Sequence, residues 1–472
     1  MTDFPVEPKP TEPAEPRLTR SLGVWEATAL NVTNMVGIGP FVTIPAFIAA
    51  MNGPQAMIGW VLGAVLVLCD GLVWAELGAA LPGSGGSYHF LKQIYSRYRF
   101  GNAMPFMFAW QFLVGGTLET ASAYIGFVLY LDYALPQLRQ GLIAAGVPDV
   151  LPLGTWGAMR PAGGVIAALL VVIIAVVLSR GIARLGRLGL WFVAGTLVTT
   201  TTVIVCGLTN FDASLLTLPA DAFRLDQAFL FGLGGAMTIA VYDYFGYYNI
   251  CHLGDEVRDP QHTIPRAVLG SIAIVAVTYL LMNLSIIAVV PWQEAMHSTN
   301  IAATFMERLY GRSVAVAFTL LILWTAAACM FAITLGYSRI PYAAARRGDF
   351  FASFARLHPV HAYPQTSLWT ISGLTACFCF LELELVIKAA VTVRLGVQFI
   401  GQIVGWHLIR SQRSPAELPF RMWLYPLPSA VGLVGWLFLL RTSEPAALTL
   451  AGVVLISGLI AYGAKSRWAP AG

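Results

Sequence analysis

Charged residues are scarce in this chain. Only 11% of its 472 residues are Asp, Glu, Lys or Arg, whereas 57% are hydrophobic. A typical soluble domain carries about a quarter charged residues, and the mean hydropathy of +0.71 lies far on the apolar side. The composition therefore excludes a soluble globular protein and predicts an integral membrane protein.

Polar domains are also missing between the apolar segments. A helix that crosses a bilayer needs about 20 mostly apolar residues, and such segments follow one another along most of the chain. We therefore predict one all-α transmembrane domain over residues 21–464. Its twelve predicted spans are 22–51, 55–81, 103–134, 163–180, 187–209, 228–251, 264–291, 313–343, 366–382, 384–410, 421–441 and 445–464.

Both ends of the chain lack a long apolar stretch. Residues 1–20 are rich in Pro and Glu and contain nothing that resembles a signal peptide. We expect a disordered cytoplasmic tail there, because such a segment cannot bury enough apolar surface to fold. Residues 465–472 form a second, short cytoplasmic tail in this interpretation.

Cysteine and histidine do not occur in metal-binding spacings. His358 and His361 have no further ligand nearby in the sequence, and the segment GSGGSY lacks the Lys-Ser/Thr ending of a phosphate-binding loop. The HExxH and GxSxG motifs of enzymes are absent too. We therefore predict no metal, no cofactor and no enzymatic activity. Free thiols are expected at the six cysteines, Cys69, Cys206, Cys251, Cys329, Cys377 and Cys379.

The basic residues lie mostly in segments that the twelve-span count places inside the cell. The net charge is +4, and all but eight of the 28 Lys and Arg fall in cytoplasmic loops or tails by this count. Loops rich in Lys and Arg stay on the cytoplasmic side of a membrane. The charge pattern therefore supports twelve spans with both termini in the cytoplasm, and it gives no indication of nucleic-acid binding.

The first span contains a sequence that breaks helices. Gly37, Ile38, Gly39 and Pro40 lie in its middle, where glycine weakens a helix and proline removes a backbone donor. Freed backbone groups are tolerable in a membrane only where they face protein or a watery cavity. The half-helix that begins near Pro40 would point its positive end at such a cavity, which suits a carboxylate. A kink used only for close packing is the alternative.

The sixth span is interrupted as well. Asp243 and Gly246 lie in it within a cluster of aromatic residues, Tyr242, Tyr244, Phe245, Tyr247 and Tyr248. Two broken helices at matching positions of two five-helix halves indicate an inverted repeat with a solute site near the bilayer midplane. The two halves match only in this position, because no repeat is visible residue by residue.

Four segments resemble one family of transporters. These are MVGIGPF, WAELGAALPGSGGSYHFLKQIY, FGYYNICHLGDEVRDPQHTIPRAV and LGYSRIPYAAARRGDFF, in this order between about residues 22 and 420. They resemble the amino acid-polyamine-organocation transporters, in particular bacterial amino acid permeases of the inner membrane. The resemblance implies a LeuT-like fold of five plus five helices, with repeats at about 22–209 and 228–410, and two extra helices over 421–464. It also implies transport of amino acids or polyamines by alternating access.

The resemblance also implies where the solute binds. The backbone of Val36, Gly37, Ile38 and Gly39 would receive the solute carboxylate, and the segment from Tyr242 through Asp243, Tyr244 and Phe245 to Gly246 would face its amino group. The physical reason agrees, because both charges of a zwitterion must be satisfied when it leaves water. Tyr242 corresponds to an aromatic gate in the family, with ordinary aromatic packing as the alternative.

Four ionisable residues lie within predicted spans, namely Asp70, Glu119, Asp243 and Arg394. A charge inside the bilayer is costly, so each is a candidate functional residue. Asp243 is placed to bind a cationic group or to carry a proton, and Glu119 is a candidate proton relay. Alternatively, Asp70 or Glu119 simply neutralises Arg394. Many relatives carry a coupling Lys in the fifth helix, whereas Thr196 lies closest to that position here, which places that route of proton coupling in doubt.

Gate candidates lie on the predicted cytoplasmic side. Glu76 ends the second span, and Asp255, Glu256 and Arg258 follow the sixth, where they would lock the gate through salt bridges or simply face water. The leading hypothesis is a secondary transporter of amino acids, working as a proton symporter or an exchanger. A polyamine or cationic amino-acid carrier is second, and a nutrient sensor without transport is a remote alternative. The expected partners are a small-molecule solute and the lipid bilayer, and no oligomeric state is assigned.

Overall fold

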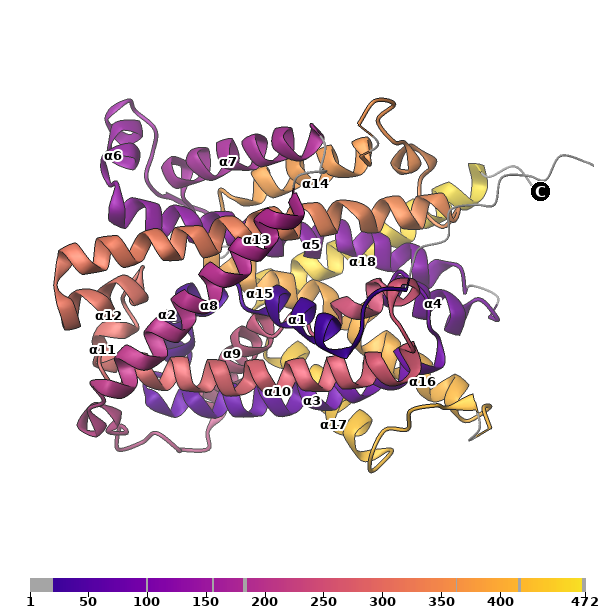
Figure 1. Cartoon of the computed structure of the whole chain (residues 1–472), viewed down its shortest axis with the longest axis horizontal. Helices are drawn as coiled ribbons and strands as arrows, with labels where there is room; N and C mark the ends of the chain where they lie inside the picture. Colours follow the sequence, from indigo (N-terminus) through magenta and orange to yellow (C-terminus); the bar gives the residue numbers. More distant parts are fainter. Residues whose placement is uncertain are drawn as a thin grey trace, which may run out of the picture.

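The chain folds almost entirely into helices. A computed structural model describes residues 20–98, 101–154, 157–180, 185–361, 363–414 and 417–468, and its long helices run roughly side by side (Figure 1). Within these residues the only sheet is a short antiparallel pair, β1 (Leu151–Pro152) and β2 (Ala158–Met159). The predicted all-α class is confirmed, whereas residues 1–19 and 469–472 of the two predicted tails lie outside the described residues.

Each of the twelve predicted spans contains helix. In the first half of the chain the helices are α1 (Val24–Met35), α2 (Gly39–Met51), η1 (Pro54–Ala56), α3 (Met57–Ala80), α4 (Ser87–Tyr95), α5 (Ala103–Ala134), α6 (Gln137–Ala144), α7 (Pro161–Ser179), α8 (Leu185–Thr209) and η3 (Ala213–Leu216). In the second half they are α9 (Gln227–Asp243), η4 (Asn249–His252), η5 (Gly254–Glu256), α10 (Pro260–Ile287), α11 (Trp292–Ala295), α12 (Ile301–Tyr310), α13 (Arg312–Arg346), η6 (Ala352–Ala355), α14 (Gln365–Phe378), α15 (Leu383–Arg394), the π-helix η7 (Leu395–Ile400), α16 (Gly401–Arg410), α17 (Leu427–Thr442) and α18 (Pro445–Trp468).

Both predicted interruptions are present. The axes of α1 and α2 differ by 53° across the break between Met35 and Gly39. Helix α9 ends at Asp243, and Gly246 then takes a φ of +112°, a conformation that only glycine adopts easily. The chain continues into the short 3₁₀ helix η4. Glycine and proline therefore end these helices where the sequence pattern indicated.

The molecule is a mostly helical membrane protein. Among the described residues, six helices are long and apolar enough to cross a bilayer, or seven if the bent pair of α1 and α2 counts as one span. Helices α8 and α17 add shorter apolar stretches, Ala194–Thr209 and Leu427–Thr442. The remaining predicted spans consist of helices that are broken or short, so length alone does not count them.

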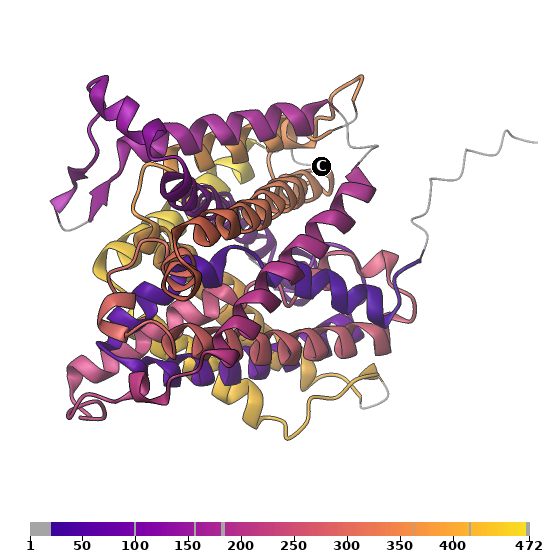
Figure 2. The same ribbon diagram turned by 60° about the vertical axis from the view of Figure 1, so that its left-hand side comes forward.

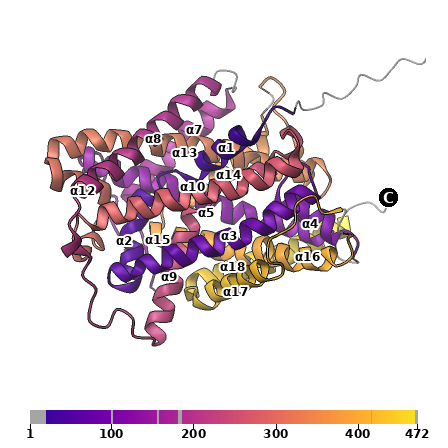
Figure 3. The ribbon, with the colours of Figure 1, turned by 60° about the horizontal axis from the view of Figure 1, so that its bottom comes forward.

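The helices pack in a way that brings distant parts of the chain together. Helix α10 lies along α3 (Figures 1 and 3), and α13 packs against α5. Helix α7 lies at one edge over α14 (Figure 2), while α17 packs on α3 at another side (Figure 3). The broken helices contact members of both central pairs: α1 contacts α10 and α13, α2 contacts α5 and α9, and α9 contacts α3. The buried core around them includes Trp60, Trp74 and Trp436.

Candidate functional site

The break in the first span is lined by groups that satisfy its free backbone. The carbonyl of Met35 accepts hydrogen bonds from the Gly37 N–H, at 3.0 Å, and from the Tyr279 hydroxyl of α10, at 2.5 Å. Val36 and Ile38 are almost fully buried. A Cβ added at Gly37 would lie 3.0 Å from the sulfur of Cys329 in α13. The unwound segment is therefore held against α10 and α13.

A second backbone group is released inside α2. Pro45 has no N–H, so the carbonyl of Phe41, one turn earlier, loses its helical partner. The hydroxyl of Tyr130 in α5 donates to that carbonyl at 2.6 Å. The same hydroxyl accepts a hydrogen bond from the Ala302 N–H at 3.2 Å. Tyr130 thus joins α2, α5 and α12 at one buried point.

The two breaks touch each other. Asn31 of α1 is fully buried, and its side-chain amide donates to the carbonyl of Tyr247 at 2.6 Å and accepts from the Ile250 N–H at 2.9 Å. A Cβ added at Gly246 would lie 3.2 Å from the backbone nitrogen of Met35. One side chain of the first broken helix therefore forms hydrogen bonds with the free backbone of the second broken helix.

Asp243 lies at the point where the broken helices meet. Its side chain comes from the last residue of α9 and is 3% exposed. The Thr43 hydroxyl of α2 donates to its Oδ2 at 2.6 Å. Its Oδ1 lies against Gly39, the first residue of α2, where an added Cβ would overlap it. Within the described residues Oδ1 has no hydrogen-bond partner, and the carboxylate has no cationic partner.

The aromatic side chains around the end of α9 lie against different helices. Tyr242 is half-buried, and its hydroxyl shares a short hydrogen bond with Ser122 of α5. The ring of Phe245 lies 6.1 Å from that of Tyr242. Tyr244 is fully buried between Trp60 and Tyr279. Tyr242 is therefore positioned to link α9 with α5, whereas Tyr244 packs in the core.

Glu119 and Arg394 form a buried ion pair. The contact joins the carboxylate of α5 to the guanidinium of α15, which is 1% exposed. Arg394 also donates to the Tyr248 hydroxyl at 3.3 Å, and its charge lies 5.0 Å from the centre of the Phe245 ring. A Cβ added at Gly115 would lie 3.2 Å from the Arg394 side chain. Of the two predicted partners for this arginine, the structure selects Glu119.

Asp70 has a different environment. It is 1% exposed and accepts hydrogen bonds from the hydroxyl of Tyr247 and, at 3.0 Å, from the indole of Trp436. These two groups come from the segment after α9 and from α17. Asp70 therefore joins three parts of the helix bundle and lies apart from Arg394.

The predicted gate residues differ in the partners that they bond. Glu76 is fully buried and accepts from Arg410 at 3.0 Å and Trp406 at 2.9 Å. Asp255 accepts from the Ser84 N–H at 3.0 Å, and Arg258 donates to the carbonyl of Arg20 at 3.3 Å.

The hypothesis that Asp255, Glu256 and Arg258 lock the gate through salt bridges stays a prediction. None of the three has an ion-pair partner among the residues that the structure describes. Instead, the carbonyl of Glu256 accepts from the N–H groups of Ser21 and Leu22, at 2.9 and 3.0 Å. The backbone of this segment is therefore bound to residues 21 and 22 ahead of α1, while the Asp255 carboxylate and the Arg258 guanidinium bond Ser84 and Arg20.

A cluster missed in the sequence joins α4 to the end of α13. Tyr88 and Lys92 both donate hydrogen bonds to the carboxylate of Asp349, and the bond from Lys92 is 2.6 Å long. The guanidinium of Arg347 lies 5.7 Å from the centre of the Tyr88 ring and donates to the carbonyl of Ser84 at 3.3 Å. Burial, together with the Asp349 carboxylate, raises the pKa of Tyr88, so that its phenol stays protonated and donates. The motifs GSGGSY and RRGDF contain most of these residues, but nothing in either motif indicates that they meet.

Thr196 is buried in α8, which packs on α10 and α13. Its carbonyl accepts from the hydroxyl of Thr200 at 3.0 Å. One turn away, Thr325 of α13 donates to the hydroxyl of Thr199 at 3.3 Å. Uncharged hydroxyl groups therefore connect α8 to α13 at the level where the resemblance places a lysine in many relatives.

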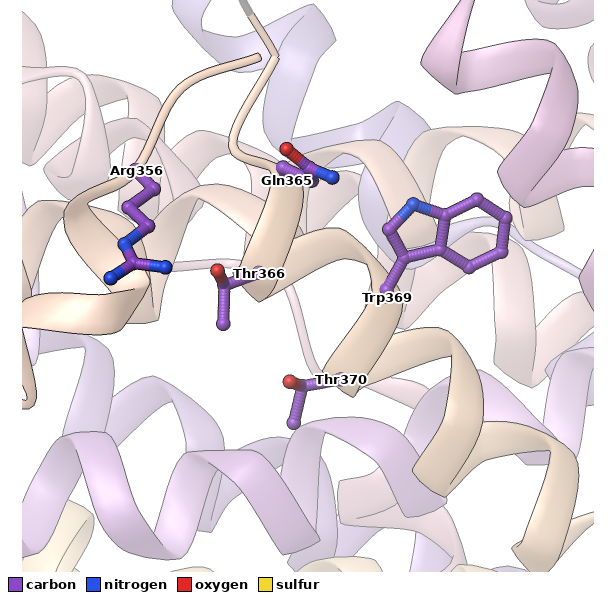
Figure 4. Close-up of a pocket in the computed structure, with 5 residues that line it drawn as sticks. All are labelled: Arg356, Gln365, Thr366, Trp369 and Thr370. Carbon is purple, nitrogen blue, oxygen red and sulfur yellow. The ribbon is translucent and has the colours of Figure 1, made fainter.

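The described residues contain no group of three or more His, Cys, Asp or Glu side chains that could hold a metal ion. A cavity of about 440 Å³ lies at the start of α14, between Arg356 and the side chains of Gln365, Thr366, Trp369 and Thr370 (Figure 4). None of these residues belongs to either break. The cavity is therefore separate from the site built around Asp243.

Several known proteins are similar to this chain over most of its length. A family model described as amino acid permease matches residues 22–457. An uncharacterized transporter of Mycobacterium tuberculosis is 28% identical over 96% of this chain and 94% of its own length. The serine/threonine exchanger SteT of Bacillus subtilis is 23% identical over 95% of this chain and 98% of its own. The human Asc-type amino acid transporter 1 is 25% identical over 94% and 81%.

Proposed function

Because the chain belongs to the amino acid permease family, whose members are transporters and not enzymes, we propose that it is a secondary carrier working by alternating access. Its solute is an amino acid or a closely related compound, bound between the two interrupted helices. The proposed site comprises the backbone from Val36 to Gly39 and the segment from Tyr242 to Gly246. Tyr242 acts as the gate over the solute.

This proposal rests on the contact between the two breaks. Gly246 lies against the backbone of Met35, and Asp243 lies against Gly39. Unwound backbone inside a membrane protein is found where it faces protein or a cavity, and half-helix ends supply partial charges for a polar solute. Two breaks far apart, each packed against lipid, would have supported a purely structural role.

The proposed topology is that of the LeuT-like fold. It has twelve spans, with five-helix repeats over 22–209 and 228–410, two extra helices over 421–464, and both termini in the cytoplasm of a bacterial cell. The twelve helical segments and the position of the breaks in the first and sixth support it. The bundle that contains α1, α2 and α9 would rock against the helices around α5 and α13.

Exchange is the mode of transport that the side chains favour over proton symport. The Glu119 carboxylate is bound to the Arg394 guanidinium in a buried ion pair, so it does not stand free as a proton relay. Thr196 provides no cation in the fifth span. SteT, one of the relatives, is named as an exchanger.

Counterflow in proteoliposomes tests the proposed function. Vesicles with purified protein are loaded with unlabelled solute, and uptake of labelled solute is followed with and without a proton gradient. An exchanger shows transient accumulation that requires internal solute and does not respond to the gradient. Uptake without internal solute that follows the gradient would indicate symport. Binding without any flux would indicate a sensor, and unsaturable flux would indicate a channel, so either result would contradict a carrier.

A further inference from the structure

The cavity at the start of α14 contains a cation but no acid. It measures about 440 Å³ and is lined by Arg356, Gln365, Thr366, Trp369 and Thr370 (Figure 4). Among the described residues the Arg356 guanidinium forms neither an ion pair nor a hydrogen bond. A guanidinium group matches the geometry of a phosphate and binds it through two hydrogen bonds. The lining therefore favours a ligand that carries a phosphate.

The backbone fixes Arg356 beside the first turn of α14. The Gln365 N–H donates to the Arg356 carbonyl at 3.2 Å, and the His358 N–H donates to the Tyr363 carbonyl at 2.9 Å. These two bonds fold the segment before α14 back on itself. Figure 4 shows the Arg356 guanidinium on one side of the cavity and the side chains of α14 beside it. The cation is therefore placed by the fold of this segment.

The two threonines of the cavity have free hydroxyl groups. In α13 the hydroxyls of Thr325 and Thr334 donate to the carbonyl four residues earlier in their own helix, at 3.0 and 2.7 Å. Neither Thr366 nor Thr370 forms such a bond, or any other side-chain hydrogen bond within the described residues. They lie one turn apart on α14, so both hydroxyls can donate to oxygen atoms of one ligand.

The cavity lies at one end of a helix face that is exposed within a predicted span. Trp369, Gly373 and Cys377 follow one another at intervals of four residues on α14, and all three are exposed. Helix α7 packs on α14 (Figure 2) and exposes the apolar side chains of Ile173 and Val177. In the proposed topology these faces contact lipid, and Trp369 lies near the membrane surface, where tryptophan is enriched.

We propose that this cavity binds the headgroup of an anionic phospholipid. The phosphate lies between the Arg356 guanidinium and the hydroxyls of Thr366 and Thr370. The acyl chains follow the exposed faces of α14 and α7, which places the lipid in the cytoplasmic leaflet of the proposed topology. The inference goes beyond the proposed function, because it concerns neither the solute nor the two breaks.

The net charge of the lipid determines how well it fits. Phosphatidylcholine carries a choline cation beside its phosphate, and the lining of the cavity provides no acid to receive that cation. Phosphatidylglycerol carries the phosphate as its only charge, and this charge neutralises Arg356. The attraction between one basic side chain and an anionic lipid corresponds to roughly a fivefold difference in affinity.

Native mass spectrometry of the purified full-length protein in neutral detergent tests the inference. Phosphatidylglycerol and phosphatidylcholine with identical acyl chains are titrated separately, and the first bound lipid is quantified. We expect the wild type to bind phosphatidylglycerol at a concentration roughly fivefold or more below that of phosphatidylcholine. Arg356→Gln should abolish this preference. Arg266→Gln is the matched control, because Arg266 is also exposed at the predicted cytoplasmic side, in α10, and lies outside the cavity.

A second variant tests the site without changing its charge. Thr370→Val keeps the shape of the side chain and removes one hydroxyl, so the phosphate loses one donor. We expect phosphatidylglycerol to bind this variant roughly threefold more weakly than it binds the wild type. Binding of phosphatidylcholine should change less, because it does not occupy the cavity in the same way.

Three results would overturn the inference. An equal loss of preference in Arg356→Gln and Arg266→Gln would mean that the basic surface as a whole attracts the lipid. An unchanged preference in Arg356→Gln would place the lipid elsewhere. Binding of glycerol 3-phosphate to the wild type as tight as that of phosphatidylglycerol would show that the cavity takes a soluble anion. Solute counterflow is measured separately, so each of these results leaves the proposed function standing.

Discussion

At the scale of single residues, the absence of a side chain at Gly39 decides the geometry of the site. Only a hydrogen atom separates the first residue of α2 from the carboxylate of Asp243. The sequence indicated Gly39 as part of a helix break, but glycine there serves a second purpose. It lets a charged group approach the end of a half-helix more closely than any other residue would permit.

Gly39→Ala should therefore inactivate the protein without unfolding it. The new Cβ would overlap Oδ1 of Asp243 and push the carboxylate away from Thr43. We expect loss of solute counterflow in proteoliposomes, with the protein still monodisperse and folded. Gly373→Ala in α14 is the matched control, because its Cβ would meet nothing within 4 Å. Normal transport by Gly39→Ala would show that Asp243 does not need this contact.

The pair of Glu119 and Arg394 gives a second prediction at this scale. Arg394→Met leaves the carboxylate of Glu119 buried and unpaired, and we expect a loss of about 3–5 kcal/mol in the free energy of unfolding. The double variant with Glu119→Gln removes both charges and should recover most of that loss. Thermal or denaturant unfolding in detergent measures the cycle. Additive effects of the two substitutions would contradict a direct pair.

The functional residues differ in how far the sequence could identify them. Asp243, Glu119 and Arg394 were identifiable because charges inside apolar spans are costly and need a reason. Their partners were identified only in part: Glu119 was one of two candidates for Arg394, whereas a single sequence does not show that Thr43 faces Asp243. Asp70 illustrates the difference, since only the structure shows that it bonds Tyr247 and Trp436.

At the scale of secondary structure elements, the sequence predicted where the helices break. It did not predict which side chains bond the backbone groups released at the breaks. Glycine and proline indicated where α1 and α9 would end, and both ends lie there. The groups that satisfy the released backbone come from distant helices, namely Tyr279 from α10, Tyr130 from α5 and Asn31 from α1. Such side chains look like ordinary polar residues in a span until the packing is known.

Tyr130→Phe tests the support of α2. The substitution leaves the carbonyl of Phe41 without a donor in a buried place, because Pro45 cannot provide one. We expect the free energy of unfolding to fall by about 1–3 kcal/mol. Tyr133→Phe, one turn away, removes a hydroxyl that bonds Glu307 near the surface and should cost less. Equal losses in both variants would mean that the Phe41 carbonyl finds another partner.

At the scale of the whole molecule, a resemblance in four motifs predicted more than the composition did. Apolar length identifies six or seven spans among the described residues, because broken and short helices escape that criterion. The motifs, in contrast, follow the order of the chain and include the breaks themselves. What they did not predict is how the loops meet, for example that the backbone of Glu256 and Arg258 bonds Ser21 and Leu22.

The contacts between α4 and the end of α13 allow a prediction about the molecule as a whole. Tyr88 and Lys92 both bind Asp349, and Lys465 at the end of α18 donates to the adjoining carbonyl of Gly348 at 2.6 Å. If alternating access opens this side, these contacts must separate first. Asp349→Asn weakens both hydrogen bonds from α4 and removes the ion pair with Lys92. It should therefore shift the population toward the opened state.

The labelling rate of Cys329 reports this shift, because its sulfur lies beside Gly37 at the first break. In a background where the other five cysteines are serine, we expect Asp349→Asn to increase the rate of thiol modification several-fold. Lys388→Gln removes ion pairs to Glu384 and Glu444 at the predicted external side and is the control. An equal rate in both variants would mean that the contacts of Asp349 do not govern access to the breaks. The packing of the buried helices alone would then close this side.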